Sequence, residues 1–132
     1  MSDGPPGAGG ARIVLYVQAL VYLVTGAWPL VHLESFEWVT GEKYDDFLVH
    51  TVGLLLVVVG AVLLRALRRA VLTAELLWVA AGTAASLLVI DVVYWWNGRL
   101  SPVYLADAAI EAVFLVTALR LARRSEPHDR HP

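Results

Sequence analysis

Four long apolar runs alternate with short polar segments along the chain. The runs cover about residues 12–33, 47–64, 71–96 and 102–121. Each is close to the ~20 residues that an α-helix needs to cross ~30 Å of hydrocarbon. Helices also satisfy their own backbone hydrogen bonds, which an open strand in lipid does not. The pattern therefore predicts an all-α fold, a four-helix transmembrane bundle with up-down-up-down topology.

The segments between the runs contain residues that start and end helices. Asp46 comes at the start of the second run, where a carboxylate caps a helix and favours its dipole. Asn97 and Gly98 break the third run, and Pro102 suits the first turn of the fourth helix. The turn at residues 65–69 is very short. We therefore expect the second and third helices to be antiparallel neighbours in contact along most of their length.

The two ends of the chain differ from the runs in composition. Residues 1–11 are rich in Gly and Pro, and residues 125–132 combine charged side chains with two prolines. Chains of this kind cannot bury enough apolar surface to offset the entropy of ordering them. We expect two disordered tails, with residues 12–124 forming the membrane domain.

Composition and charge distribution agree with a membrane protein. Hydrophobic residues make up 58% of the chain and charged residues 17%, whereas soluble domains are nearer half apolar. Basic residues flank the runs unequally, since only Lys43 and Arg99 lie on one side. The other side holds Arg12, Arg65, Arg68, Arg69, Arg120, Arg123, Arg124 and Arg130. The positive-inside rule then places both termini in the cytoplasm. An Arg-, Ala- and Val-rich composition favours a bacterial inner membrane as the location of this multi-pass protein.

Six ionisable side chains lie within the apolar runs, where each costs up to ~2.5–3.5 kcal/mol on insertion. They are His32, His50, Glu75, Asp91, Asp107 and Glu111. Asp107 and Glu111 are four residues apart and therefore share one helix face. If each polar stripe faces the bundle axis, four of the six converge in an outward-facing pocket with Glu111 as its floor. These four are His32, His50, Asp91 and Asp107.

This convergence has a functional and a structural interpretation. In the functional one, the cluster binds a ligand or exchanges protons, because two carboxylates one turn apart repel each other strongly in a low dielectric. Such a pair is suited to trading a proton near neutral pH. In the structural one, His and Asp side chains hydrogen-bond across helices and hold a small bundle together.

Other kinds of site have less support in the sequence. No pair of ligands shares a short spacing such as His-x-x-x-His, and a haem would require His32 and His50 on opposite sides of the ring, so we predict no metal and no cofactor. The chain has no cysteine, which excludes disulfides and thiol chemistry. It contains no P-loop and no Gly-x-Ser-x-Gly, so no catalytic residue is identified. The flanking arginines are topology determinants and lipid contacts, and no nucleic acid is expected as a partner.

Aromatic residues concentrate on the predicted outer side of the membrane. They are Trp38, Tyr44, Tyr94, Trp95, Trp96 and Tyr104. Rings of this kind settle at the headgroup level and form a belt. The bias toward one side leaves room for an outer vestibule, lined by Trp28, Trp95 and Tyr104, that takes a lipid, a quinone or another small molecule.

Three segments carry a resemblance to known proteins. They are Gly26-Ala-Trp28-Pro29-Leu-Val-His32, Thr51-Val-Gly53-Leu-Leu-Leu and Ser101-Pro102-Val-Tyr104-Leu-Ala-Asp107. Together they resemble uncharacterised small bacterial four-span membrane proteins and, more loosely, DoxX-like membrane proteins. The resemblance implies four short helices with a Gly-rich second span and, for some relatives, a link to quinone-coupled oxidation. It transfers no catalytic residue. Small multidrug exporters resemble a different plan, with a glutamate in the first span that this chain lacks.

The sequence leaves three functions open. The first is a binding or accessory membrane subunit, which forms a homodimer or part of a larger complex through the small residues of 80–86. The second is a proton-coupled small-molecule transporter that uses the intramembrane Asp107–Glu111 pair. The third is a DoxX-like redox or lipid- and quinone-handling protein that works at the outer vestibule.

Overall fold

The computed structural model describes residues 8–40, 46–98 and 103–125, all helical except for short connections. The helices are α1 (Ala8–Val31), α2 (Leu33–Thr40), α3 (Asp46–Arg68), α4 (Ala74–Trp96) and α5 (Val103–Ser125). The all-α prediction is confirmed for these residues. Three stretches are long and apolar enough to cross a membrane, namely Gly9–Val31, Phe47–Arg68 and Ala74–Val93. The bilayer is therefore the environment that fits this chain.

Some predictions concern positions outside the described residues. They include the tails at 1–7 and 126–132, the aromatic side chains of Tyr44 and Tyr94, and the residues Lys43, Arg99, Pro102 and Arg130. Within the described part, α1 begins at Ala8, inside the stretch expected to be disordered. The short helix α2 is also unexpected, because its segment is interpreted from sequence only as a polar connection.

Helix ends depend on local capping. The α4 helix begins after Thr73, whose hydroxyl oxygen accepts a hydrogen bond from the backbone N–H of Leu76 at 3.2 Å. This cap starts the helix three residues later than the apolar run predicts. The α3 and α5 helices each extend about one turn beyond their apolar runs. Basic side chains in those last turns, such as Arg68 and Arg124, interact favourably with the helix dipole.

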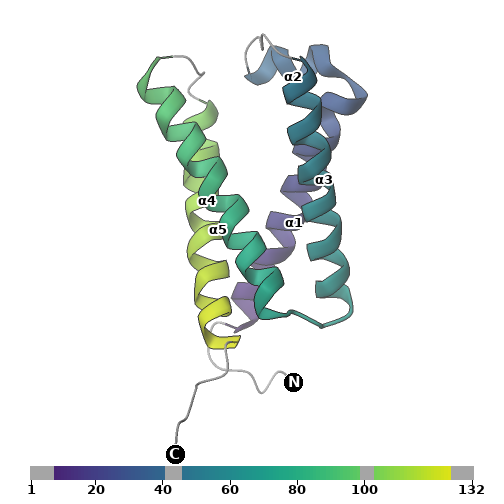
Figure 1. Ribbon diagram of the computed structural model, residues 1–132, viewed down its shortest axis with the longest axis vertical. Helices are drawn as coiled ribbons and strands as arrows, with labels where there is room; N and C mark the ends of the chain where they lie inside the picture. Colours follow the sequence, from purple (N-terminus) through teal and green to yellow (C-terminus); the bar gives the residue numbers. More distant parts are fainter. Residues whose placement is uncertain (1–7, 41–45, 99–102, 126–132) are drawn as a thin grey trace, which may run out of the picture.

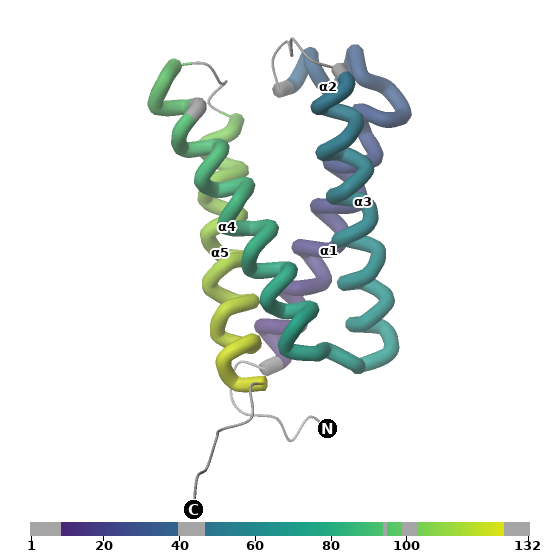
Figure 2. Tube along the Cα trace, viewed as in Figure 1, coloured from purple at the N-terminus to yellow at the C-terminus, as the bar shows by residue number. Residues whose placement is uncertain are grey.

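The four long helices form two antiparallel pairs. The α1 helix packs along α3, and α4 packs along α5. The prediction that the second and third spans contact each other along most of their length is wrong. Those helices, α3 and α4, make few contacts and diverge away from the turn that connects them (Figure 1; Figure 2). A short turn keeps two helix ends close, but packing along the rest depends on which faces fit.

Glycines explain why α3 packs against α1. A Cβ atom added to Gly26 would lie 2.5 Å from the carbonyl oxygen of Gly53, and one added to Gly53 would lie 2.6 Å from the carbonyl oxygen of Gly26. A Cβ on Gly60 would lie 2.8 Å from the carbonyl oxygen of Ala19. The two backbones therefore touch at two levels, as small residues allow between membrane helices.

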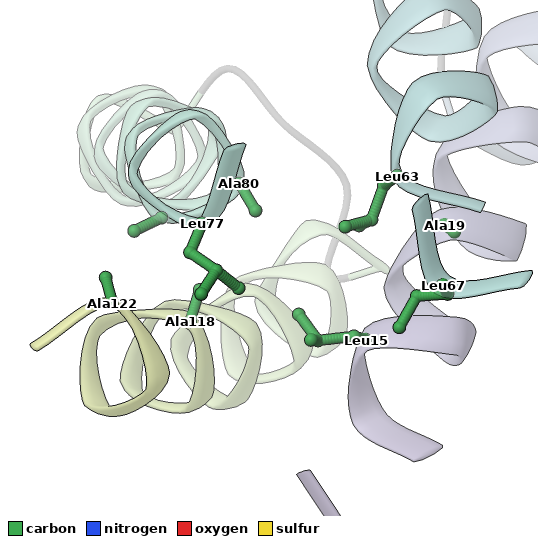
Figure 3. Packing of buried hydrophobic residues seen from close by; sticks show 9 residues of the cluster. Leu15, Ala19, Leu63, Leu67, Leu77, Ala80, Ala118 and Ala122 are labelled. Atoms are coloured by element: carbon green, nitrogen blue, oxygen red, sulfur yellow. The ribbon is translucent and has the colours of Figure 1, made fainter. Parts of the chain in front are cut away.

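The pairs meet in one apolar core near the α3–α4 turn. Its buried residues come from all four long helices: Leu15, Ala19, Leu63, Leu67, Leu77, Ala80, Ala81, Ala118 and Ala122. Figure 3 shows Leu77 directed toward Ala118 of α5, while Leu63 and Leu67 extend from α3 on the side of Leu15. We call these nine residues the inner core. Arg12 adds a polar tie, because its guanidinium donates to the carbonyl oxygen of Leu67 at 3.1 Å.

The two ends of the molecule are formed by different elements. The start of α1, the α3–α4 turn and the end of α5 lie together at what we call the turn end (Figure 1). The α2 helix lies at the opposite end, the α2 end. The small residues of 80–86 are divided between two environments, because Ala80, Ala81 and Ala84 are buried while Gly82 and Ser86 are exposed. A homodimer through this segment stays a prediction.

Candidate functional site: a buried carboxyl cluster

The two histidines lie in a corner formed by α1, α2 and α3. His32 connects α1 to α2, and its Nδ1 accepts a hydrogen bond from the backbone N–H of Ser35 at 3.1 Å, which caps α2. The Nε2–H of His50 donates to the carbonyl oxygen of Pro29 at 3.1 Å, near the end of α1. Both rings thus satisfy backbone groups at helix ends. Their predicted convergence with the carboxyl groups is not observed.

The carboxyl groups of α4 and α5 do come together. Asp91 is 5% exposed and Glu111 is 1% exposed, while Asp107 is half-buried. The carboxyl groups of Asp91 and Asp107 lie within interaction range of each other, and Glu111 is close enough to act electrostatically on Asp91. An ionised carboxylate only accepts hydrogen bonds. Two ionised carboxylates at this range in a low dielectric would repel each other, so a proton between them would stabilise the contact.

The α1 helix completes the site with two polar side chains. The hydroxyl of Tyr22 donates to Oε2 of Glu111 at 2.8 Å. The Nε2 group of Gln18 donates to the Tyr22 oxygen at 3.2 Å and to the carbonyl oxygen of Ala80 at 3.1 Å. Both side chains are fully buried. We call Gln18, Tyr22, Asp91, Asp107 and Glu111 the carboxyl cluster.

Helical spacing explains how each element presents its side chains. Gln18 and Tyr22 are four residues apart, as are Asp107 and Glu111, so each pair lies on one face of its helix. The Tyr22 ring also packs edge-on against Phe114, with centroids 6.0 Å apart and planes at 85°. Sequence reasoning identifies the three acids but misses Tyr22. Its position one turn after Gln18 is the signal that identifies it.

The cluster has more hydrogen-bond acceptors than donors. Oε1 of Gln18 and Oδ2 of Asp91 are buried and have no hydrogen-bond partner. Leaving such a group unpaired costs about 1–3 kcal/mol. Among the described residues, the one basic side chain in the first half of α1 is Arg12, which donates to Leu67 at the turn end. Hydrogen bonds from Tyr22 and Gln18 therefore contribute to holding the cluster together.

Metal coordination does not match this arrangement. Within the described ranges, no group of three or more His, Asp or Glu side chains has the geometry to hold a metal ion. Divalent ions need several oxygen or nitrogen ligands at fixed short distances. Carboxyl groups beside a tyrosine hydroxyl are able to bind, release and transfer protons and to form hydrogen bonds.

The aromatic residues of the predicted vestibule lie in different settings. The indole N–H of Trp28 donates to the Ser35 hydroxyl at 2.8 Å, and its ring packs edge-on against Phe36 in the α1–α2 corner. Trp95 is exposed near the end of α4, and Tyr104 is half-buried at the start of α5. All three residues lie toward the α2 end, as expected for a belt of aromatic side chains at a membrane interface. A lipid, quinone or other ligand among them stays a prediction.

Comparison with known proteins adds no family to this geometry. No family model, no curated protein and no solved structure matches the chain. The resemblance to DoxX-like membrane proteins therefore stays a prediction. The function has to be inferred from the arrangement of the side chains themselves.

Proposed function

We propose that the chain is a four-span protein of the bacterial inner membrane, with the turn end in the cytoplasm. The first three spans are α1, α3 and α4, which are apolar enough by composition. The fourth is α5, which is 23 residues long, as α3 and α4 are, and packs along α4. The acids Asp107 and Glu111 lie on the face of α5 that points into the bundle. Exposed residues such as Ile110 and Val113 present an apolar surface to lipid. Seven arginines of the described residues lie toward the turn end and support this orientation: Arg12, Arg65, Arg68, Arg69, Arg120, Arg123 and Arg124.

We infer that the protein carries out proton-coupled transport of a small molecule, with the carboxyl cluster as its proton-binding site. The observation that supports this most is the burial of two acids, Asp91 and Glu111, between the helices of an apolar bundle, with Asp107 beside them and Tyr22 donating to Glu111. Ionisable side chains within spans are costly, and those that persist commonly form proton relays or substrate sites.

The location of the cluster couples proton binding to the contact between the two helix pairs. The Tyr22–Glu111 hydrogen bond joins α1 of one pair to α5 of the other. A hydrogen bond to an ionised carboxylate is roughly twice as strong as one to a neutral group. Protonation of Glu111 therefore weakens this link, and loss of the proton strengthens it. A transporter requires such a link between its site and its conformation.

Proton exchange by the purified chain tests the proposal. A pH jump through neutrality in weakly buffered detergent, followed with an indicator dye, counts the protons taken up. The infrared carbonyl band of protonated carboxylic acids reports the same event. We expect Asp91→Asn and Glu111→Gln each to lower the uptake and to reduce the band. Glu75→Gln is the matched control, because Glu75 is exposed at the start of α4. An unchanged uptake in both cluster variants would falsify the proposal and favour a structural role.

A further inference from the structure

The carboxyl cluster is not equally close to the two ends of the molecule. Asp107 lies four residues after the start of α5 at the α2 end, roughly 6 Å along the helix axis. Glu111 lies 14 residues before Ser125 at the other end, about 21 Å along the axis. Burial increases in the same direction, because Asp107 is half-buried, Asp91 is 5% exposed and Glu111 is 1% exposed.

An apolar layer lies between the acids of the cluster and the turn end. Each of the nine residues of the inner core is exposed by 2% or less. They come from all four long helices, which are brought together there (Figure 3), whereas α3 and α4 diverge toward the α2 end (Figure 1). A proton crossing this layer would find no hydrogen-bonding side chain among those nine residues. The inner core therefore acts as a barrier.

The hydrogen-bonded chain of the cluster ends at this barrier. It passes from Glu111 through Tyr22 to Gln18 and stops at the backbone carbonyl of Ala80. The other titratable side chains of the described α1, α3, α4 and α5 lie near the helix ends or outside the cluster. At the α2 end these are His50 and Tyr104, joined by His32, Glu34 and Glu37 of the neighbouring α1–α2 corner. The rings of His32 and His50 bind backbone groups. Toward the turn end the titratable side chains are Arg12, Tyr16, Arg65, Arg68, Glu75, Arg120, Arg123 and Arg124.

We infer that the carboxyl cluster, in this conformation, exchanges protons with the α2 side of the membrane only, and that the inner core closes it from the turn side. This inference rests on the proposed proton-binding function and adds the side of the membrane from which protons reach the cluster. The structure then corresponds to the state open to the outside in a transport cycle. Release of protons to the cytoplasm then requires the residues of the inner core to separate, as the two helix pairs move relative to each other.

Single-cysteine labelling tests the direction of access, because the natural chain has no cysteine. Charged, membrane-impermeant thiol reagents are added to either face of oriented membrane vesicles. The variants Asp107→Cys and Ala118→Cys probe the cluster and the inner core on the same helix. Trp38→Cys and Arg124→Cys are exposed controls for the α2 end and the turn end. Size-exclusion profiles report whether each variant is folded.

We expect Asp107→Cys to be labelled from the face that labels Trp38→Cys and from no other. Ala118→Cys should be protected from both faces. Labelling of Asp107→Cys from the turn side, or of Ala118→Cys from either side, would overturn the inference. If Asp107→Cys does not fold, the unmodified chain serves instead in proteoliposomes of one orientation. The infrared band of protonated carboxyl groups should then follow the pH on the α2 side.

The two proposals fail in different ways. A band that follows the pH on the turn side overturns the one-sided access and leaves the proton-binding function in place. A band that follows the pH on neither side, while the protein is folded, overturns the proton-binding function itself.

Discussion

The two helix pairs are held together by different means. The α1–α3 pair uses glycines, so that the backbones touch at Gly26 and Gly53 and again at Gly60. The α4–α5 pair uses alanines near the turn end, but two carboxyl groups, Asp91 and Asp107, lie in contact toward the α2 end. Along its middle, the α1–α3 pair is therefore closed by the fit of two backbones, whereas the α4–α5 pair encloses acids whose repulsion depends on their protonation.

This difference assigns a role to each pair. The α1–α3 pair presents Tyr22 and Gln18, whose hydrogen bonds reach α5 and α4. The α4–α5 pair contributes all three acids. A change in protonation therefore acts within one pair and is transmitted to the other through two hydrogen bonds. In a two-state transporter, the proton-sensitive pair is the one expected to move.

The largest effect is expected where the backbones touch. Gly26→Val would place side-chain atoms against the carbonyl oxygen of Gly53, and backbone atoms cannot move aside as a flexible side chain does. Such overpacking should lower the free energy of unfolding by about 3 kcal/mol or more. Gly82→Val is the control, because a Cβ there meets nothing within 4 Å. Circular dichroism during unfolding in detergent measures both. Equal stability of the two variants would contradict the glycine-contact account.

Overpacking the second pair should cost less. Ala84→Leu enlarges a fully buried side chain on α4, and about 1–3 kcal/mol of stability should be lost. Neighbouring side chains on α5 are able to shift, unlike the backbone beside Gly26. The control is Ala106→Leu, on the exposed face of α5. A loss for Ala84→Leu larger than that for Gly26→Val would reverse the ranking of the two pairs.

Removing the hydrogen bond between the pairs tests their coupling. Tyr22→Phe leaves Glu111 without its donor, and a cost of about 1–3 kcal/mol is expected. A double-mutant cycle with Glu111→Gln separates this bond from the packing of the ring. Additive effects in the cycle would mean that Tyr22 and Glu111 do not act together.

The smallest effect on stability is expected within the aspartate pair. Asp91→Asn still donates a hydrogen bond to Asp107, so the free energy of unfolding should change by less than about 1 kcal/mol. The proton held by the pair should nevertheless disappear from the uptake measurement. Loss of stability without loss of proton uptake would show that Asp91 has a structural role only.

The candidate site could be predicted in part. The spacing of Asp107 and Glu111 predicts a shared face, and the cost of acids in lipid predicts that the face lies inside the bundle. The spacing of Gln18 and Tyr22 marks a polar face of α1, but it does not tell which acid of another helix that face meets. The histidines are misplaced by the same reasoning, since it assumes that every polar residue faces the axis. His32 and His50 instead bind backbone groups freed at helix ends.

Hydropathy and charge along the chain by themselves determined the helical character, the apolar spans and the acids that must avoid lipid. These follow from local energetics, because each residue pays its own cost of transfer into hydrocarbon. The tertiary structure decided which helices pair, since that depends on how closely surfaces fit at Gly26, Gly53 and Gly60. It also decided that Tyr22 joins Glu111 across the two pairs. Such contacts link residues far apart in the chain, and only their joint packing selects one arrangement.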